Sequence, residues 1–454
     1  MMSRRFLATV AVAAAATVAL AGCSGSTGGG STGAPAGGAI DGTGKTLTVM
    51  MSANGLYPEQ QKQWFQKVSD AFEEKTGAKV SFETFASAND ELTKIQTSVL
   101  SNQGPDVYGL GTTFTPTAYA TGAFVKLGDA EWEKVGGRDR FTPSLLGISG
   151  PSEKDEVGIP FASRPFVMAY NKDLLAATGI TEPPTTWDEL TAAAKKTTTG
   201  DVHGLAVAYA DNYDPWKFIW GMSVQAGNPL VDVKDKKSTI DDPAVTAAYD
   251  TYFGWYRDGL VDPAAVGWKN AQAVAAFAEG KAAFLPMTSA VSKATFASSP
   301  VASSYAYALL PTVPPGETSR GADGKEAASI LSGDNLVVAQ YSPNQDLAFA
   351  LIEMITSTEW QKEYFDTFGE LPTGAEAAAQ VEKDNPDLSA NVQAAAKSVA
   401  TPFTGAWGDT QLALTNVVVQ SLPALQAGSL SDDAIAAAVK DAAGASQSAL
   451  DKSK

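Results

Sequence analysis

The segment "VGIPFASRPFVMAYNKDLL" (157–175) has the composition of a buried strand until "NKDLL", where a helical pattern begins. A charged Arg164 and a rigid Pro165 interrupt it in the middle. Proline fixes its own φ and disfavours helical backbone at the residue before it. We therefore expect Arg164 to be extended, with its charge at a break in an otherwise apolar stretch.

Upstream of this break, strand and helix patterns alternate. The sequence predicts strands at 45–53, 78–85 and 105–111, separated by helices at 59–77 and 89–104. In the first helix the apolar side chains recur at helical spacing, and Gly77 provides a C-cap. Strand, helix, strand, helix, strand is typical of a parallel sheet in an α/β lobe.

Downstream, the same alternation predicts a second α/β lobe. Thr186 is placed to cap a helix that follows the proline pair of residues 183–184. Helices are predicted at 171–179, 183–198, 242–261, 270–280 and 343–369, strands at 204–210, 281–286 and 304–312, and two strands around a turn within 327–340. The remainder from about residue 372 reads as alanine-rich helix.

Length and charge limit the possible functions. A chain of 454 residues exceeds one ordinary core and indicates two domains or one large bilobal body. With 33 basic and 50 acidic residues, the net charge of −17 repels phosphate backbones, so we expect no nucleic-acid partner. Uncharged or weakly charged ligands fit this balance better.

The N-terminus has the layout of a secretory signal, with Arg4 and Arg5 before an apolar run. Its ending, "LAGC", resembles the bacterial lipobox, which implies cleavage after residue 22 and a diacylated Cys23. We expect residues 1–22 to be a signal peptide and residues 23–44 a flexible tether. Lipid on Cys23 would hold the protein on the outer face of the cytoplasmic membrane.

Enzyme signals are weak. Cys23 is the only cysteine, which excludes an intramolecular disulfide and a Cys-x-x-Cys pair, and His203 is the only histidine. No phosphate-binding, metalloprotease or nucleophile-elbow motif follows a predicted strand, so we expect no cofactor, no metal and no catalytic residue. A glycoside hydrolase needs only two carboxylates, and this alternative stays open.

Aromatic residues in polar loops point to carbohydrate. Sugars offer flat C–H faces and a rim of hydroxyls, so their sites combine aromatic rings with polar side chains. The stretches 209–221 and 401–411 have this mixture. For Trp216 and Trp407 a ligand contact and a core position are about equally favoured, whereas Trp220 reads as core.

Several stretches, in order, resemble the extracellular solute-binding proteins of ABC importers, family 1, which include the maltodextrin-binding proteins. The clearest is "GIPFASRPFVMAYNKDLLAATGITEPPTTWDEL" (158–190). Others are "AFEEKTGAKV", "GPDVYGLGTTFTPTAYATGAFVKL", "FAEGKAAFLP", "YALLPT", "LSGDNLVVAQYSPNQDLAFALIEMITSTEWQ" and "GELPT". Together they span roughly residues 45 to 445.

The resemblance implies a two-lobed α/β fold of the type II periplasmic-binding-protein kind, with the ligand in a cleft between the lobes. It places the chain crossings near 160–166, 304–312 and 368–372. Lobe 1 would comprise residues 45–162 and 308–370, and lobe 2 residues 163–307 and 371–454. Arg164 would then lie at a crossing, either as a ligand donor or as a partner for a carboxylate across the gap.

By the same resemblance, ligand-binding positions can be carried over to loops that face the cleft. They are Asn54, Tyr57, Thr113, Phe114, Arg164, Tyr213, Trp216, Ser289, Asp334, Asn335, Glu370 and Trp407. The implied function is capture of a mono- to oligosaccharide without chemistry, by a monomer that delivers it to the transmembrane permease subunits of an ABC importer. A non-sugar solute, such as an amino-acid derivative, a polyamine or a peptide, is the alternative within binding proteins.

Overall fold

The computed structural model describes residues 40–211 and 214–453. The chain from Ile40 onward forms one compact unit, which contains two main β-sheets. The tether and lipid predictions for residues 1–39, including Cys23, lie outside the described residues.

The first sheet begins with the predicted strand and helix alternation, which is confirmed. Strands β1 (Thr46–Ser52), β2 (Lys79–Phe85) and β3 (Val107–Gly111) alternate with helices α1 (Pro58–Thr76) and α2 (Ala88–Ser101). β1 pairs in parallel with both β2 and β3. This is the arrangement expected when helices cross over between adjacent strands.

Helix α1 shows why the alternation was readable. Trp64, Val68 and Phe72 are four residues apart and all buried, so one face of the helix covers the sheet. Gly77 ends the helix in a left-handed conformation and donates its N–H to the carbonyl of Glu73. Both features are local, and the sequence predicted both.

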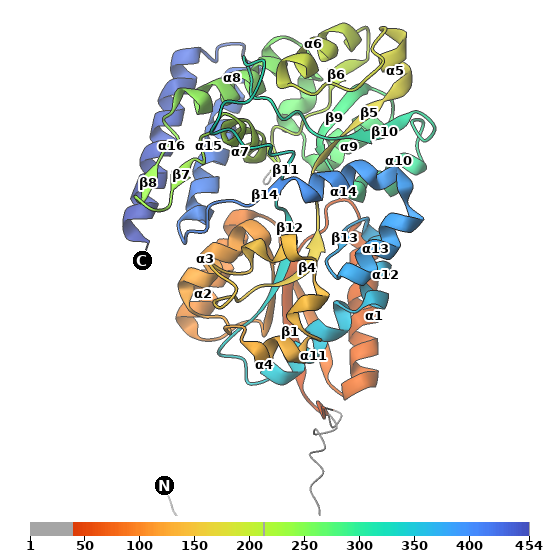
Figure 1. Cartoon of the computed structure of the whole chain (residues 1–454), viewed down its shortest axis with the longest axis vertical. Coiled ribbons are helices and arrows are strands. Elements are labelled where there is room, and N and C mark those ends of the chain that lie inside the picture. Colours follow the sequence, from red (N-terminus) through yellow and green to blue (C-terminus); the bar gives the residue numbers. More distant parts are fainter. Residues whose placement is uncertain (1–39, 212–213, 454) are drawn as a thin grey trace, which may run out of the picture. The chain divides into compact units, whose positions relative to one another are not determined.

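Three further strands complete the first sheet and make it mixed. They are β4 (Ile159–Ser163), β12 (Gly333–Val338) and β13 (Leu371–Pro372), and the strand order is β13-β4-β12-β3-β1-β2. β12 runs antiparallel to both β3 and β4. Figure 1 shows this sheet between α2 and α3 on one side and α1 and α12 on the other.

The second sheet consists of β5 (Val167–Asn171), β6 (His203–Leu205), β9 (Ala282–Thr288) and β10 (Tyr305–Ala308), in the order β10-β5-β9-β6. β6 is shorter than the strand predicted at 204–210. Between β4 in the first sheet and β5 in the second stand only residues 164–166. The charged break in the opening segment is therefore the point where the chain passes from one sheet to the other.

Helices and short strands fill the remaining chain. The helices are α3 (Thr115–Thr121), α4 (Asp129–Lys134), α5 (Lys172–Ala177), α6 (Trp187–Thr197), α7 (Pro215–Gln225), α8 (Pro243–Arg257), α9 (Asn270–Ala278), α10 (Lys293–Ala297), α11 (Gln345–Ile355), α12 (Thr358–Phe368), α13 (Ala375–Asp384), α14 (Ser389–Ala396), α15 (Trp407–Gln426) and α16 (Asp432–Lys452). The short strands are β7 (Val231–Asp232), β8 (Lys237–Ser238), β11 (Ser329–Ile330) and β14 (Ser398–Val399), and the 3-10 turns used below are η1 (Thr112–Phe114) and η5 (Ala290–Ser292).

Two details differ from the prediction. The single helix expected at 343–369 is two helices, because Ser357 caps a new helix through the backbone N–H of Trp360. The return to the first sheet falls at residues 329–333, after β11, and not at 304–312. Residues between these points stay with the second sheet, where the side chain of Gln225 donates hydrogen bonds to the carbonyls of Pro311 and Ala327.

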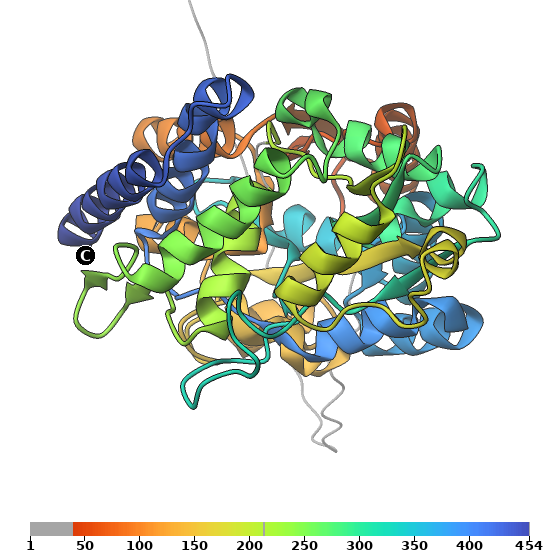
Figure 2. The same ribbon diagram turned by 90° about the horizontal axis from the view of Figure 1, so that it is seen from above.

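Each sheet has its own large apolar cluster. One joins α1, α11 and the first sheet, and the other joins α6, α7, α8, α15 and α16 to the second sheet. Seen from above, the two blue C-terminal helices α15 and α16 run side by side at the edge of the second cluster (Figure 2). None of the helices in residues 40–211 and 214–453 is both long enough and apolar enough to span a bilayer.

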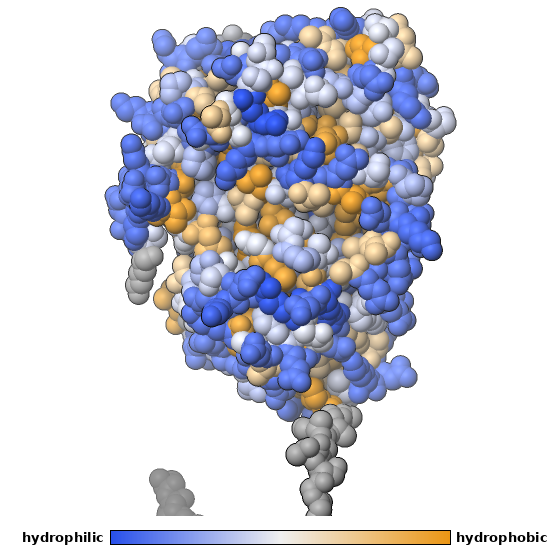
Figure 3. All heavy atoms as spheres, viewed as in Figure 1, coloured by the Kyte–Doolittle hydropathy of each residue, from blue (hydrophilic) through white to orange (hydrophobic). Residues whose placement is uncertain are grey.

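Polar residues cover much of the face shown in Figure 3. Hydrophobic residues gather across its middle, between the helices of the second sheet above and those of the first sheet below.

Candidate ligand-binding site

Arg164 is held by two carboxylates at the crossing between the sheets. Its Nη2 lies 3.0 Å from Asp334 Oδ2 and 2.6 Å from Glu370 Oε1. We call Arg164, Asp334 and Glu370 the Arg164 cluster. Both carboxylates are buried, whereas the arginine side chain keeps 28% of its surface exposed. The carboxylate partner that was one of two predicted roles for Arg164 is therefore present.

The ends of three strands bring this cluster together. Arg164 follows β4, Asp334 lies near the start of β12, and Glu370 immediately precedes β13. Gly333 makes the close approach of β12 to β4 possible: its φ is +147°, and a Cβ there would lie 1.9 Å from the carbonyl oxygen of Ala162. The positions of the two carboxylates thus follow from strand pairing.

A third buried carboxylate, Glu91 of α2, lies near this cluster and was not predicted from the sequence. It is 1% exposed, and burial together with the charge of Asp334 raises its pKa well above the usual value. Burial also raises the pKa of Glu370, Arg164 opposes this rise, and Asp334 adds to it. Two buried carboxylates therefore contact Arg164, and a third buried carboxylate lies near Asp334.

Trp216 and Trp407 form a second group, the tryptophan pair. Their rings meet edge to face, with centroids 6.0 Å apart. Trp216 is 2% exposed and Trp407 is fully buried, and both belong to the apolar cluster of the second sheet. In this conformation the structure places both in the core, which was one of the two roles considered for them.

The N-terminal end of α15 touches elements of the first sheet. Phe114 of η1 packs with Leu92 and Leu412, and Thr117 Oγ1 accepts a hydrogen bond from the N–H of Gly408 at 3.2 Å. A Cβ on Gly408 would come within 2.9 Å of that Oγ1. Trp407 therefore stands where elements of the two sheets are in direct contact. The predicted Phe114 is buried at this contact, and Thr113 is half-buried.

Several buried polar atoms in this zone have no hydrogen-bond partner within the described residues. They are Trp407 Nε1, Gln411 Oε1, Asn335 Oδ1 and Glu91 Oε1. Asn335 is otherwise anchored, because its Nδ2 donates to Thr115 Oγ1 at 3.0 Å. Buried polar groups are normally paired, so this group of unpaired atoms needs an explanation.

Two other predicted residues mark a second contact between the sheets. Tyr57 lies before α1, and its hydroxyl donates to the carbonyl of Val291 in η5 at 2.6 Å. Ser289 caps η5, and the carbonyl of Ser289 accepts from Tyr307. Asn54 instead shapes its own loop, since its Oδ1 accepts the N–H groups of Leu56 and Tyr57.

The loop before α7 holds a polar group beside the tryptophan pair. Lys217 lies 3.2 Å from Asp214 Oδ1, and its Nζ lies 4.4 Å from the centre of the Phe166 ring. Asn270 donates to the other carboxylate oxygen of Asp214. Lys217 was not among the predicted residues, and Tyr213, which was, lies outside the described residues.

Comparison with known proteins identifies a family match. The family model described as bacterial extracellular solute-binding protein matches residues 57–362. The diacetylchitobiose binding protein DasA of Streptomyces coelicolor is 29% identical over 373 residues, which cover 82% of this chain and 83% of that protein. A maltooligosaccharide ABC transporter solute-binding lipoprotein of Streptococcus pneumoniae is 25% identical over 358 residues, 77% of each chain.

Solved structures share the fold. An ABC transporter solute-binding protein from Thermotoga lettingae, bound with α-D-tagatose, has a TM-score of 0.74 at 22% identity and covers 89% of this chain and all of its own. Maltose-bound MalE3 of T. maritima has a TM-score of 0.72 at 19% identity, covering 87% of this chain and 99% of its own. The predicted type II periplasmic-binding-protein fold is confirmed.

Proposed function

We propose, because this chain belongs to the bacterial extracellular solute-binding proteins, that it captures a neutral sugar and passes it to the permease of an ABC importer. The sugar would bind between the Arg164 cluster and the tryptophan pair. The observation that carries this proposal is the group of unpaired polar atoms on Trp407, Gln411, Asn335 and Glu91. A ligand that brings both donors and acceptors, as a sugar does, would pair with them.

The Arg164 cluster supports a ligand without a carboxylate. A free arginine fork would favour an acidic solute. Here Nη2 already contacts Asp334 and both oxygens of Glu370, at 2.6 and 2.7 Å for the latter. Glu91 adds a further acceptor nearby. Sugar hydroxyls can donate to such carboxylates, and hydrogen bonds to charged groups contribute about 1.5–3 kcal/mol each.

The relatives give the same direction for the ligand class. Diacetylchitobiose and maltooligosaccharide appear in the names of the relatives, and tagatose and maltose in the titles of the solved structures. Aromatic stacking contributes about 0.5–1.5 kcal/mol per pair beyond area burial. Together with several hydrogen bonds to charged groups, such contacts reach about −8 kcal/mol, which corresponds to micromolar affinity.

Capture would depend on movement between the sheets. Contacts between them lie on two sides: Tyr57 with Val291, and Thr117 with Gly408. A ligand that touches both sheets favours the form in which these contacts are made, because only that form offers the full set of ligand contacts. Residues 164–166, 329–333 and the stretch after β13 would absorb the backbone change.

We further propose that the protein works outside the cytoplasmic membrane. A diacylated Cys23 would anchor it, and the tether between Cys23 and the folded part, which begins at Ile40, would let that part reach the permease. The relative in S. pneumoniae is named a lipoprotein. A cytoplasmic ATPase would supply the energy for transport.

A second candidate ligand is a solute that carries an amine. Glu91, Asp334 and Glu370 outnumber Arg164, and an ammonium group placed among these carboxyl groups would favour their ionised forms and pair with them. An amino sugar or a polyamine has the required group.

The test is a titration of the folded protein against neutral sugars, amino sugars, polyamines and acidic solutes. We expect saturable binding of a neutral sugar, with the sugar recovered intact. Tightest binding of a polyamine would favour the second candidate, and tightest binding of an acidic solute would overturn both. Hydrolysis products that disappear in Glu370→Gln would instead indicate a glycoside hydrolase. Against this alternative, Asp334 and Glu370 both bind the same nitrogen of Arg164 and are thereby already paired.

A further inference from the structure

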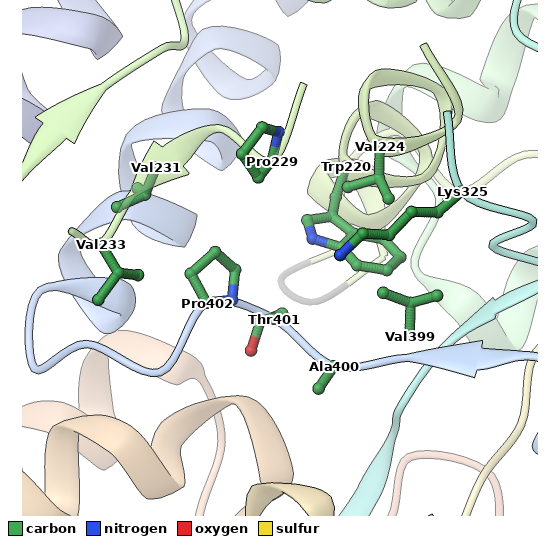
Figure 4. A pocket seen from close by; sticks show the side chains of 10 residues that line it. All are labelled: Trp220, Val224, Pro229, Val231, Val233, Lys325, Val399, Ala400, Thr401 and Pro402. Atoms are coloured by element: carbon green, nitrogen blue, oxygen red, sulfur yellow. The ribbon is translucent and has the colours of Figure 1, made fainter. Parts of the chain in front are cut away.

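A cavity of about 290 Å³ lies beside α7. Its walls come from four segments: α7, the chain around β7, the chain before β11 that carries Lys325, and β14 with the residues that follow it. The lining residues are Trp220, Val224, Pro229, Val231, Val233, Lys325, Val399, Ala400, Thr401 and Pro402. Figure 4 shows Trp220, Val224 and Lys325 on one side and Pro229, Val231, Val233 and Pro402 on the other.

Two buried polar groups in this lining lack a partner within the described residues. Trp220 is 1% exposed and its Nε1 has no hydrogen-bond partner. Thr401 is 4% exposed and its Oγ1 has none either. A buried donor left unpaired costs about 1–3 kcal/mol. Two such groups on the wall of one cavity point to a ligand that pairs with them.

The chemistry of the lining defines this ligand. An indole N–H and an ammonium can only donate, so the ligand must supply acceptors. Lys325 is the only charged residue in the lining, and no carboxylate lies there, although the protein as a whole carries a net charge of −17. An ammonium among neutral walls favours a negatively charged acceptor. The remaining lining is valine, proline and alanine, which suits an apolar body.

We propose that this cavity binds a small organic carboxylate, with the carboxylate at Trp220, Thr401 and Lys325 and a single ring or short chain against the valines. Its volume is at the low end of small-molecule pockets, which suits one ring and excludes an oligosaccharide. Neither Trp216 nor Trp407 lines this cavity.

The probes are benzoate, neutral benzamide and cationic benzylamine, each titrated into the folded protein by calorimetry. We expect benzoate to bind one to one, benzamide to bind more weakly, and benzylamine not to bind. In a ¹⁵N spectrum of the wild type, the indole N–H signal of Trp220 can be identified because it is missing from the spectrum of Trp220→Phe. This signal should shift when benzoate is added. Absence of saturable benzoate binding at millimolar concentrations would overturn the proposal, as would binding that leaves this signal unchanged.

Variants separate the contacts. Lys325→Met should weaken benzoate about tenfold, because it removes a charge-assisted hydrogen bond. Thr401→Val keeps the shape and should weaken it several-fold. Lys440→Met, an exposed lysine on α16, is the matched control and should change nothing. Lys325 is also exposed, so its replacement leaves the core intact. Equal benzoate affinity in the wild type, Lys325→Met and Thr401→Val would show that the carboxylate does not bind here.

Discussion

The Arg164 cluster and the tryptophan pair stand at the same meeting of the two sheets, but their polar atoms are satisfied in different ways. In the cluster, the charged groups pair with one another across strand ends. In the pair, the rings pack on each other while Trp407 Nε1 and the nearby Gln411 Oε1 stay unpaired. The first arrangement holds the chain crossing together. The second leaves hydrogen-bonding capacity for a ligand, and this difference is open to direct tests.

The largest effect is expected for Trp407→Ala. Removing a fully buried tryptophan should lower the free energy of unfolding by about 3–5 kcal/mol. It should also weaken sugar binding about a hundredfold, because an aromatic surface and an unpaired donor are lost together. Denaturant unfolding and calorimetry measure the two effects.

Trp64→Ala is the matched control for that variant. Trp64 is a core tryptophan of the first sheet, so its removal should lower stability without changing affinity among folded molecules. If Trp407→Ala kept wild-type affinity, Trp407 would be a core residue only.

Arg164→Met should have the next largest effect. It leaves Asp334 and Glu370 buried without their cation, and breaking a buried pair in this way costs about 3–5 kcal/mol. The matched variant Glu370→Gln keeps the shape and leaves Arg164 with Asp334, so its loss should be smaller. Equal melting temperatures for the wild type and Arg164→Met would show that the Arg164 cluster does not stabilise the fold.

Glu91→Gln should change the dependence of stability on pH. Burial and then Asp334 raise the pKa of Glu91, so its folded pKa lies above its unfolded value. Below the usual pKa of 4.5 the group is protonated in both states, and the free energy of unfolding is unaffected. As pH rises from there through the folded pKa, the free energy of unfolding falls, because the unfolded state ionises more readily. Glutamine has no such loss.

The variant should therefore gain stability over the wild type as pH rises above 4.5. Thermal unfolding at several pH values gives this difference. A constant difference at all pH values would mean that Glu91 does not titrate with a raised pKa.

The smallest effect is expected for Thr117→Val. It removes the hydroxyl that bridges α3 to Gly405 and Gly408 on the tryptophan side. The loss should be about 0.5–1.5 kcal/mol in the form that has these contacts. Because the contact joins elements of the two sheets, sugar should also dissociate faster, as stopped-flow fluorescence would show. An unchanged dissociation rate of the sugar would show that the contact between Thr117 and α15 does not help to hold the two sheets together around the ligand.

Local patterns account for the parts of the fold that could be predicted. The apolar spacing and Gly77 fixed α1, and the Thr186 cap fixed the start of α6. The return crossing was misplaced because the chain between β10 and β11 is rich in turn residues. Its position depends on distant contacts such as Gln225 with Pro311 and Ala327. The break before α12 had a local signal, the capping residue Ser357, which the amphipathic pattern concealed.

The sequence predicted which residues belong to the candidate site better than it predicted which of them contact one another. Arg164, Asp334 and Glu370 were all singled out, but only strand pairing determines that one nitrogen contacts both carboxylates. Glu91 had a signal in the sequence, because it shares a helical face with the buried Ile95 and Ser98. Lys217 had none beyond its place next to Trp216.

The central claim is that a neutral sugar binds between the Arg164 cluster and the tryptophan pair. A crystal structure of the protein with its tightest-binding sugar tests this claim most directly. We expect one ring of the sugar to contact Trp407 or Trp216 and a hydroxyl to donate to Glu91, Asp334 or Glu370. A sugar bound elsewhere, with Trp407 Nε1 and Glu91 Oε1 still unpaired, would contradict the account.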